Sequence, residues 1–177
     1  MKTTEKNLDM LEVLHQIESE LPRLLEIDMN KYWHSLLVNY HPPMVERLWY
    51  DWNEFRICLH VIHACTTDEA LFHTHPWPSA MRIVHGSYEM GIGYGTGETE
   101  PPIAAKVMLG PGCEYEMVEP DGWHYVRPLT ETTATLMVTG KPWGRSSPKS
   151  DKPLGPLSGA RVEEIKNIFR KYYRTKN

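Results

Sequence analysis

Residues 55–139 consist of short segments in which apolar and polar side chains alternate, separated by turns that contain Gly or Pro. Alternation with a period of two is typical of β-strands that bury one face. The strands expected on this basis cover residues 55–62, 81–83, 88–94, 103–109, 114–118, 123–127 and 132–139. Many short strands at nearly regular spacing favour an antiparallel sandwich or barrel, and we expect a jelly roll.

The first forty residues carry a helical pattern instead. Apolar residues recur there at three- and four-residue steps, namely Leu8, Leu11, Leu14, Ile17, Leu21, Leu24 and Leu25. This spacing gives one apolar stripe on a helix, which Pro22 is expected to kink or restart. We expect a second short helix from Met29 to Val38, ended by His41-Pro42-Pro43, because a residue before proline is pushed toward extended geometry.

The C-terminal part predicts an extended arm followed by a helix. Residues 141–156 are rich in Pro, Ser, Gly and Lys and are expected to form a loop rather than core. Beyond them, one helical face carries Val162, Ile165, Ile168, Phe169 and Tyr172, with Ser158 as N-cap and Lys171 and Arg174 near the end. We therefore divide the chain into an N-terminal helical segment (1–43), a barrel (44–140), and an arm with a C-terminal helix (141–177).

Composition excludes several classes of protein. A chain of 177 residues can bury one good core without a second domain. Its net charge of −4 and its scattered Lys and Arg residues argue against nucleic acid as a partner. No apolar run is long enough to cross a membrane, and the N-terminus lacks a signal-peptide core, so we expect a soluble cytoplasmic protein. The three cysteines, Cys58, Cys65 and Cys113, are expected to be reduced thiols rather than a disulfide framework.

The sequence His73-Thr74-His75-Pro76-Trp77 places two histidines one residue apart at the end of an extended run. Positions i and i+2 of a strand face the same way, so both imidazoles can enter one cavity. A third histidine follows a turn in Pro120-Asp121-Gly122-Trp123-His124. Three neutral nitrogen donors suit Fe, Zn, Cu or Ni. We therefore predict a metal site formed by His73, His75 and His124.

The spacing of these residues resembles the two signature motifs of the cupin superfamily. The first motif in most cupins reads His-x-His, three or four residues, Glu, six residues, Gly; here Ser79 or Ala80 stands at the Glu position, and Gly86 follows. The second reads Pro-x-Gly-x-x-His, and this chain has the shorter Pro-x-Gly-x-His ending at His124. The resemblance covers roughly residues 44–140 and implies a mainly β, cupin-type antiparallel jelly-roll barrel, with helices before it and one after it.

Cupins with three histidines and no glutamate look like the thiol and diketone dioxygenases. The resemblance therefore implies one divalent metal, with Fe(II) favoured and Zn, Ni or Mn as alternatives. It implies a non-haem Fe(II) dioxygenase that acts on a small anionic organic acid or thiol, because an all-histidine site lacks one negative charge that the substrate can supply. A metal-dependent isomerase or lyase and a non-enzymatic ligand-binding cupin remain open, and a homodimer is compatible with each of them.

Further side chains are candidates for the pocket. The expected substrate-binding residues are Arg82, Tyr88 and Trp77. Arg56 and Arg127 are alternative carboxylate clamps, although strand alternation sets Arg127 on the opposite face from His124. Glu89 and Glu114 could replace the missing glutamate but are expected to be solvated. Packing roles are expected for the remaining strand histidines, which are His60, His63 and His85.

Overall fold

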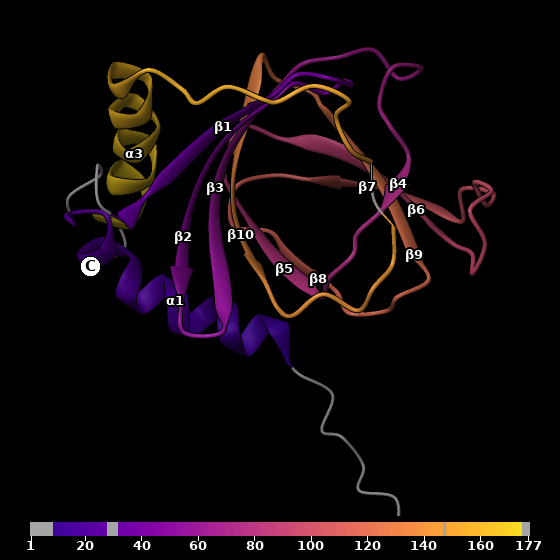
Figure 1. Cartoon of the computed structure of the whole chain (residues 1–177), viewed down its shortest axis with the longest axis horizontal. Coiled ribbons are helices and arrows are strands. Elements are labelled where there is room, and N and C mark those ends of the chain that lie inside the picture. The colour runs from indigo at the N-terminus through magenta and orange to yellow at the C-terminus, as the bar shows by residue number, and fades with distance from the viewer. Residues whose placement is uncertain (1–8, 28–31, 147, 175–177) are drawn as a thin grey trace, which may run out of the picture.

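Two antiparallel β-sheets face each other, and the helices at the two ends of the chain cover the outer face of the larger sheet (Figure 1). The computed structural model describes residues 9–27, 32–146 and 148–174. The larger sheet has the strand order β1 (His34–Val38), β2 (Val45–Trp52), β3 (Phe55–His63), β10 (Thr132–Thr139), β5 (Ser79–His85) and β8 (Glu114–Met117). The smaller sheet has the order β4 (His73–Thr74), β9 (Gly122–Pro128), β6 (Tyr88–Tyr94) and β7 (Ala105–Leu109).

The mainly β prediction with flanking helices is confirmed. The strands β6 and β10 have the bounds that alternation predicted, and the other predicted strands are found within a few residues of their expected positions. In the described part of the chain, no strand of one sheet is hydrogen-bonded to a strand of the other. The sheets therefore form an open two-layer arrangement, compatible with a jelly-roll sandwich, rather than a closed barrel.

The second N-terminal helix, expected over residues 29–38, is wrong for the part that the structure describes. Residues 28–31 lie outside the described residues, and His34–Val38 forms strand β1, which pairs along its whole length with β2. The run Leu36-Leu37-Val38 has no clear period and fits a strand covered on both faces. Strand β2 supplies the hydrogen-bond partners for β1. Alternation did not predict β2, because one of its faces packs in the core beneath the helices and the other faces a cavity.

The N-terminal helix α1 (Met10–Leu24) begins at Asp9, whose carboxylate accepts a hydrogen bond from the Glu12 N–H at 2.9 Å. Its predicted stripe is buried, apart from Leu8, which lies outside the described residues, and Leu11, which is half-buried. Pro22 lies inside the helix, which continues to Leu24.

The C-terminal helix α3 (Gly159–Arg174) is capped by Ser158, whose hydroxyl accepts from the Arg161 N–H at 3.2 Å. The predicted cap is therefore confirmed. Tyr173, rather than the predicted Tyr172, is the tyrosine that this helix buries.

The main core lies between the helices and the outer face of the larger sheet. It includes completely buried side chains from α1, β2, β3 and β10, such as Leu14, Leu48, Leu59 and Leu136. The inner face of the same sheet faces the smaller sheet. Since successive side chains of a strand point to opposite faces, each central strand contributes alternately to the core and to the space between the sheets.

Gly86 lies in the short turn that connects β5 of the larger sheet to β6 of the smaller sheet. Its φ is +70°, and a Cβ at this position would lie 2.4 Å from the carbonyl oxygen of Thr132. A side chain would therefore clash with the backbone of β10 as well as strain the turn. This geometry accounts for a glycine at the motif position noted in the sequence.

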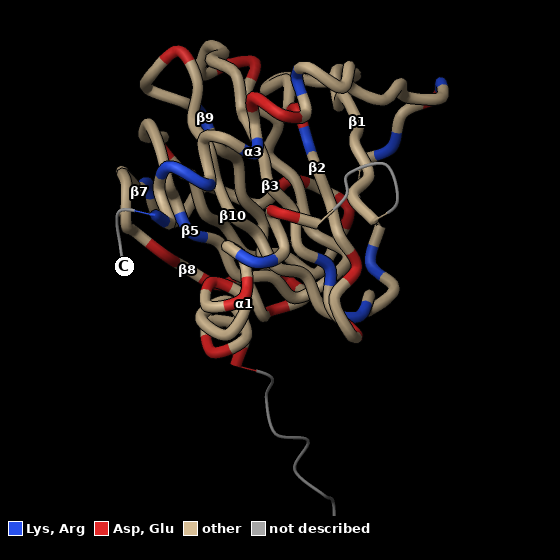
Figure 2. Tube along the Cα trace, turned by 90° about the vertical axis from the view of Figure 1, so that its left-hand side faces the viewer, with Lys and Arg blue, Asp and Glu red and all other residues tan. Residues whose placement is uncertain are grey.

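Charged residues are interspersed on the side of the molecule that Figure 2 shows, where Lys and Arg alternate with Asp and Glu and several acidic residues lie on α1. The described helices include none with the length and apolar character that a membrane crossing requires. The cysteines Cys58, Cys65 and Cys113 are all free thiols, as predicted.

Candidate functional site

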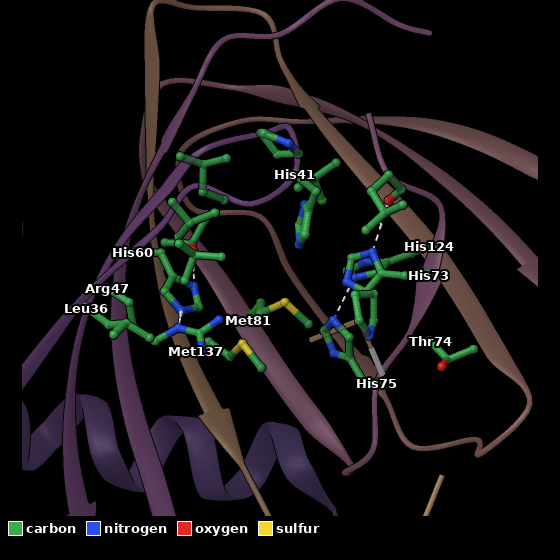
Figure 3. Close-up of a pocket in the computed structure, with 18 of the residues that line it drawn as sticks. Leu36, His41, Arg47, His60, His73, Thr74, His75, Met81, His124 and Met137 are labelled. Atoms are coloured by element: carbon green, nitrogen blue, oxygen red, sulfur yellow. Dashed lines mark hydrogen bonds between the residues drawn. The ribbon is translucent and has the colours of Figure 1, made fainter. Parts of the chain in front are cut away.

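Strands β4 and β9 bring the three predicted metal ligands together. His73 and His124 lie directly opposite each other in the antiparallel register of these strands, and His75 follows at the end of β4. One ring nitrogen from each histidine lies within 4.8 Å of the other two. Figure 3 shows the three imidazoles gathered on one side of a cavity. We call His73, His75 and His124 the three-histidine cluster.

The closest contact in the cluster fits two ligands of one ion. The Nε2 atoms of His75 and His124 are 2.9 Å apart. Two imidazole nitrogens at ~2.1 Å from an ion and at a right angle to each other are separated by about 3 Å. Without an ion, one Nε2 must carry a proton and donate it to the other, so only metal binding uses both lone pairs. The distance and donor set therefore fit a divalent metal.

The protonation state of His73 is set by its backbone partner. Its Nδ1–H donates to the carbonyl oxygen of Leu71 at 2.9 Å, which leaves the Nε2 lone pair free. The Nδ1 atoms of His75 and His124 are buried and have no hydrogen-bond partner in the described residues. Packing and strand register therefore orient these two rings.

All three imidazoles favour the neutral state that binds a metal. Burial lowers the pKa of His73 to about 4, against the raising effect of its bond to Leu71, and the charges of His41 and Arg47 lower it further. Burial is also the main cause that holds the pKa values of His75 and His124 well below the usual range, and repulsion within the cluster adds to it. The lone pairs are therefore available near neutral pH.

The cluster opens onto a cavity of about 210 Å³ between the two sheets. Trp77 and Tyr88, both predicted to bind substrate, line this cavity together with Met81 and Met137. The described residues that line it include no Asp or Glu, and Arg47 is the only Lys or Arg among them. The cavity is therefore mainly apolar, with histidines on one side and one fixed positive charge.

Arg82 lies away from this cavity. Its guanidinium forms ion pairs with Glu18 of α1 and Glu114 of β8, both at 2.5 Å, on the helix-covered side of the sheet. The other candidate clamps also have acidic partners: Arg56 pairs with Asp51 and Arg127 with Glu89. Glu89 and Glu114, the two candidates to replace the missing glutamate, are therefore ion-pair partners of arginines, and neither carboxylate lines the cavity.

Ser79 and Ala80 are the two alternatives for the glutamate position of the resembled motif, and they point to opposite faces of β5. Ser79 is completely buried at the start of β5, and its hydroxyl has no hydrogen-bond partner in the described part of the chain. Ser79 shares the inner face of β5 with Met81, which lines the cavity, whereas Ala80 packs in the core beneath the helices.

Arg47 lines the cavity although the sequence pattern did not predict it there, and His60, for which a packing role was expected, lines it too, as does Tyr115 beside the predicted Tyr88. The Nε–H of Arg47 donates to Nε2 of His60 at 2.9 Å, and the hydroxyls of Tyr88 and Tyr115 are hydrogen-bonded at 2.8 Å. The aromatic content of residues 45–52 was a signal for strand β2, which carries Arg47. The pairing of Arg47 with His60 had no local signal, because it depends on the register between two strands.

The predicted arm crosses over the loop that carries the histidines. The Thr74 hydroxyl donates to the carbonyl oxygen of Ser146 at 2.8 Å, and the Trp143 backbone N–H donates to that of Pro76 at 2.9 Å. Pro148 and Leu154 of the same arm line the cavity. The arm is therefore part of the site rather than a free loop.

No protein-family model and no curated protein matches this sequence. Similar solved structures include hydroxypropylphosphonic acid epoxidase from S. wedmorenis, at 16% identity and a TM-score of 0.49, covering 64% of this chain and 58% of that chain. A structure of Fe(II) HppE is 13% identical, with a TM-score of 0.49 and coverage of 63% and 57%. The chain thus spans less than three fifths of the length of these structures.

Proposed function

We propose that this chain is a metal-binding cupin-like protein that holds one divalent metal through the three-histidine cluster. We further propose that the metal is Fe(II) and that the protein is a non-haem dioxygenase acting on a small anionic organic acid or thiol. One observation carries the proposal: three imidazoles that favour the neutral state, that of His124 buried and those of His73 and His75 partly buried, converge at the wall of a cavity whose described lining contains no carboxylate. When bound, such an ion would supply a Lewis-acidic, redox-active centre with positions left for other ligands.

The charge of the site supports an anionic substrate. Neutral imidazoles leave both positive charges of a divalent ion uncompensated, and the described lining adds only the positive charge of Arg47. A charge in a poorly hydrated cavity is costly unless it is paired. An anionic ligand, such as a thiolate, enolate or carboxylate, would therefore bind more favourably than a neutral analogue.

The walls of the cavity support a small organic molecule. Met81, Met137, Val126 and Ile62 provide apolar surface, and Trp77 adds an aromatic wall beside His75. Such a lining excludes water from the reacting groups and strengthens their electrostatic interactions.

A second candidate function is favoured by the tyrosine pair. Tyr88 and Tyr115 line the cavity, and burial raises the pKa of both hydroxyls, so each keeps its proton at neutral pH. A mutual hydrogen bond uses only one of their two protons. The other proton could be donated to a substrate, as in an isomerase or lyase that uses Zn, Ni or Mn as a Lewis acid.

Metal content tests the first part of the proposal. We expect one divalent ion per chain in protein purified without a His tag, and loss of most of it in His73→Ala, His75→Ala and His124→Ala. His85→Ala is the control, since His85 is an exposed residue of β5 outside the cluster. Unchanged metal content in all three cluster variants would end the proposal.

Oxygen dependence tests the second part. Fe(II)-loaded protein should consume oxygen only when a suitable thiol or organic acid is present, and nitric oxide, used in place of oxygen, should give a paramagnetic signal. Turnover of a substrate under argon by Zn- or Ni-loaded protein, without any nitric oxide signal from the iron form, would favour the isomerase or lyase instead.

A further inference from the structure

Arg47 provides a fixed cation on the wall of the cavity opposite the three-histidine cluster. Figure 3 shows Arg47 and His60 on one side of the cavity and the cluster on the other, with Met81 and Met137 between them. Arg47 and His60 are direct cross-strand partners in β2 and β3, and His60 is paired in turn with Thr135 of β10. The central strands of the larger sheet therefore hold this group in place.

His60 orients the guanidinium as a neutral acceptor. Its Nε2 accepts the hydrogen bond from Arg47 Nε, so its proton is on Nδ1, which lies 3.5 Å from the Thr135 hydroxyl. Burial, together with the charge of Arg47, holds the pKa of His60 well below its usual range. Because Nε is used by His60, the Nη1 and Nη2 edge of Arg47 is the edge left for a ligand.

No acidic side chain in the described part of the chain forms an ion pair with Arg47, whereas Arg56, Arg82, Arg127, Arg161 and Arg170 each have a carboxylate partner. Arginine at a partly buried position is normally paired, and its planar fork matches a carboxylate in bidentate geometry. Two positive groups at the cavity therefore have no negatively charged partner. One is the guanidinium of Arg47, and the other is the divalent metal that the neutral ligands of the cluster would hold.

Building on the proposed function, we propose that the substrate of this site has two anionic ends. One end binds the metal held by the three-histidine cluster, and the other is an oxyanion, such as a carboxylate, that accepts hydrogen bonds from Nη1 and Nη2 of Arg47. A short apolar linker between the two ends packs against Met81 and Met137. Arg47 is thus a substrate-binding residue, and His60 is its positioning residue.

Calorimetric titration with matched pairs of small acids tests this inference. The probes are malonate, succinate and glutarate, each compared with its own mono-amide, which has nearly the same size but one negative charge. In Zn-loaded wild-type protein, we expect at least one diacid to bind about tenfold or more tightly than its mono-amide, since a hydrogen-bonded charge pair is lost with the amide. In Arg47→Met, that preference should fall to within about twofold.

Two controls separate recognition from folding. Arg56→Met removes an exposed arginine of β3 that pairs with Asp51, and it should leave the preference unchanged. His60→Phe keeps an aromatic ring but no acceptor, and it should reduce the preference without affecting mono-amide binding, which a purely structural defect would not do. A preference that persists in Arg47→Met, or no diacid preference in the wild type, would overturn the inference.

Metal content measured in the same samples distinguishes this inference from the proposed function. Bound metal together with an unchanged diacid preference in Arg47→Met would overturn the inference alone. Wild-type protein that binds no metal would overturn the proposed function, and the two-ended substrate with it. If protein that binds no metal still preferred anions and lost this preference in Arg47→Met, Arg47 would be an anion-binding residue that acts without a metal.

Discussion

The indole N–H of Trp143 donates a hydrogen bond to the carbonyl oxygen of His75 at 3.1 Å. This contact joins the arm after β10 to the loop that follows β4, 68 residues earlier in the chain. Trp143 therefore holds the backbone of one candidate metal ligand in place, although its own side chain does not line the cavity.

Trp143→Phe should weaken metal binding several-fold without unfolding the protein. The change removes one hydrogen bond of about 1 kcal/mol but keeps most of the apolar surface of the ring. Competition with a fluorescent chelator measures the effect. Trp52→Phe is the matched control, because Trp52 lies in β2 and packs against Phe55 on the outer face of the larger sheet, away from the three-histidine cluster. Equal metal affinity in the two variants would contradict the role of the arm.

Ser79→Glu should tighten metal binding and weaken the binding of anionic ligands. Ser79 lies on the inner face of β5, so a longer acidic side chain can reach toward the cluster and supply the charge that the site lacks. Ala80→Glu instead places a carboxylate in the helical core, where it should lower the free energy of unfolding by about 3 kcal/mol without metal rescue. Chelator competition and urea unfolding with and without zinc compare the two. Tighter anion binding by Ser79→Glu would contradict the charge argument.

The metal-free protein should lose stability as the pH falls from about 6.5 toward 4. Unfolded histidines titrate near 6.5, whereas burial lowers the pKa of His73 to about 4 and lowers those of His60, His75 and His124 strongly. Between these values the unfolded state binds more protons, so the free energy of unfolding rises with pH in this window and levels off above it.

Urea unfolding of the metal-free protein across this pH range measures the slope. Glu46, whose pKa is lowered from 4.5, contributes its pH dependence below that value and leaves the window from pH 5 to 6.5 to the histidines. His60→Phe should flatten the slope in that window, because it removes one buried histidine. A wild-type profile without slope there would show that the histidines are not held neutral by the fold.

Arg161→Ala should lower the free energy of unfolding by about 2 kcal/mol, because it leaves a buried carboxylate with fewer partners. Two nitrogens of Arg161 in α3 each donate to one oxygen of Glu46 in β2 at 2.7 Å, and Nε2 of His63 lies 2.8 Å from the same carboxylate. Glu164→Gln is the control, since it removes only the exposed partner of Arg161 and should change stability little. Thermal and urea unfolding of both variants compare the effects, and equal losses would contradict the importance of Glu46.

The sequence by itself determined the strand-rich class, most strand positions and the identity of the three clustered histidines. Alternation is a local property, and residues at positions i and i+2 of a strand share a face whatever the strand pairs with. For this reason His73 and His75 could be assigned to one site, and Tyr88–Tyr94 could be recognised as a strand, before any tertiary contact was known.

Only the tertiary structure decided which other residues reach the site. His34–Val38 became a strand because β2 pairs with it, Arg82 faces the helices because Glu18 and Glu114 hold it there, and Arg47 meets His60 through the register of β2 and β3. The spacing of these residues in the sequence follows neither the helix period nor the strand period. Their positions depend on strand register and on which face of the sheet the helices cover, and neither is encoded in a short stretch of sequence.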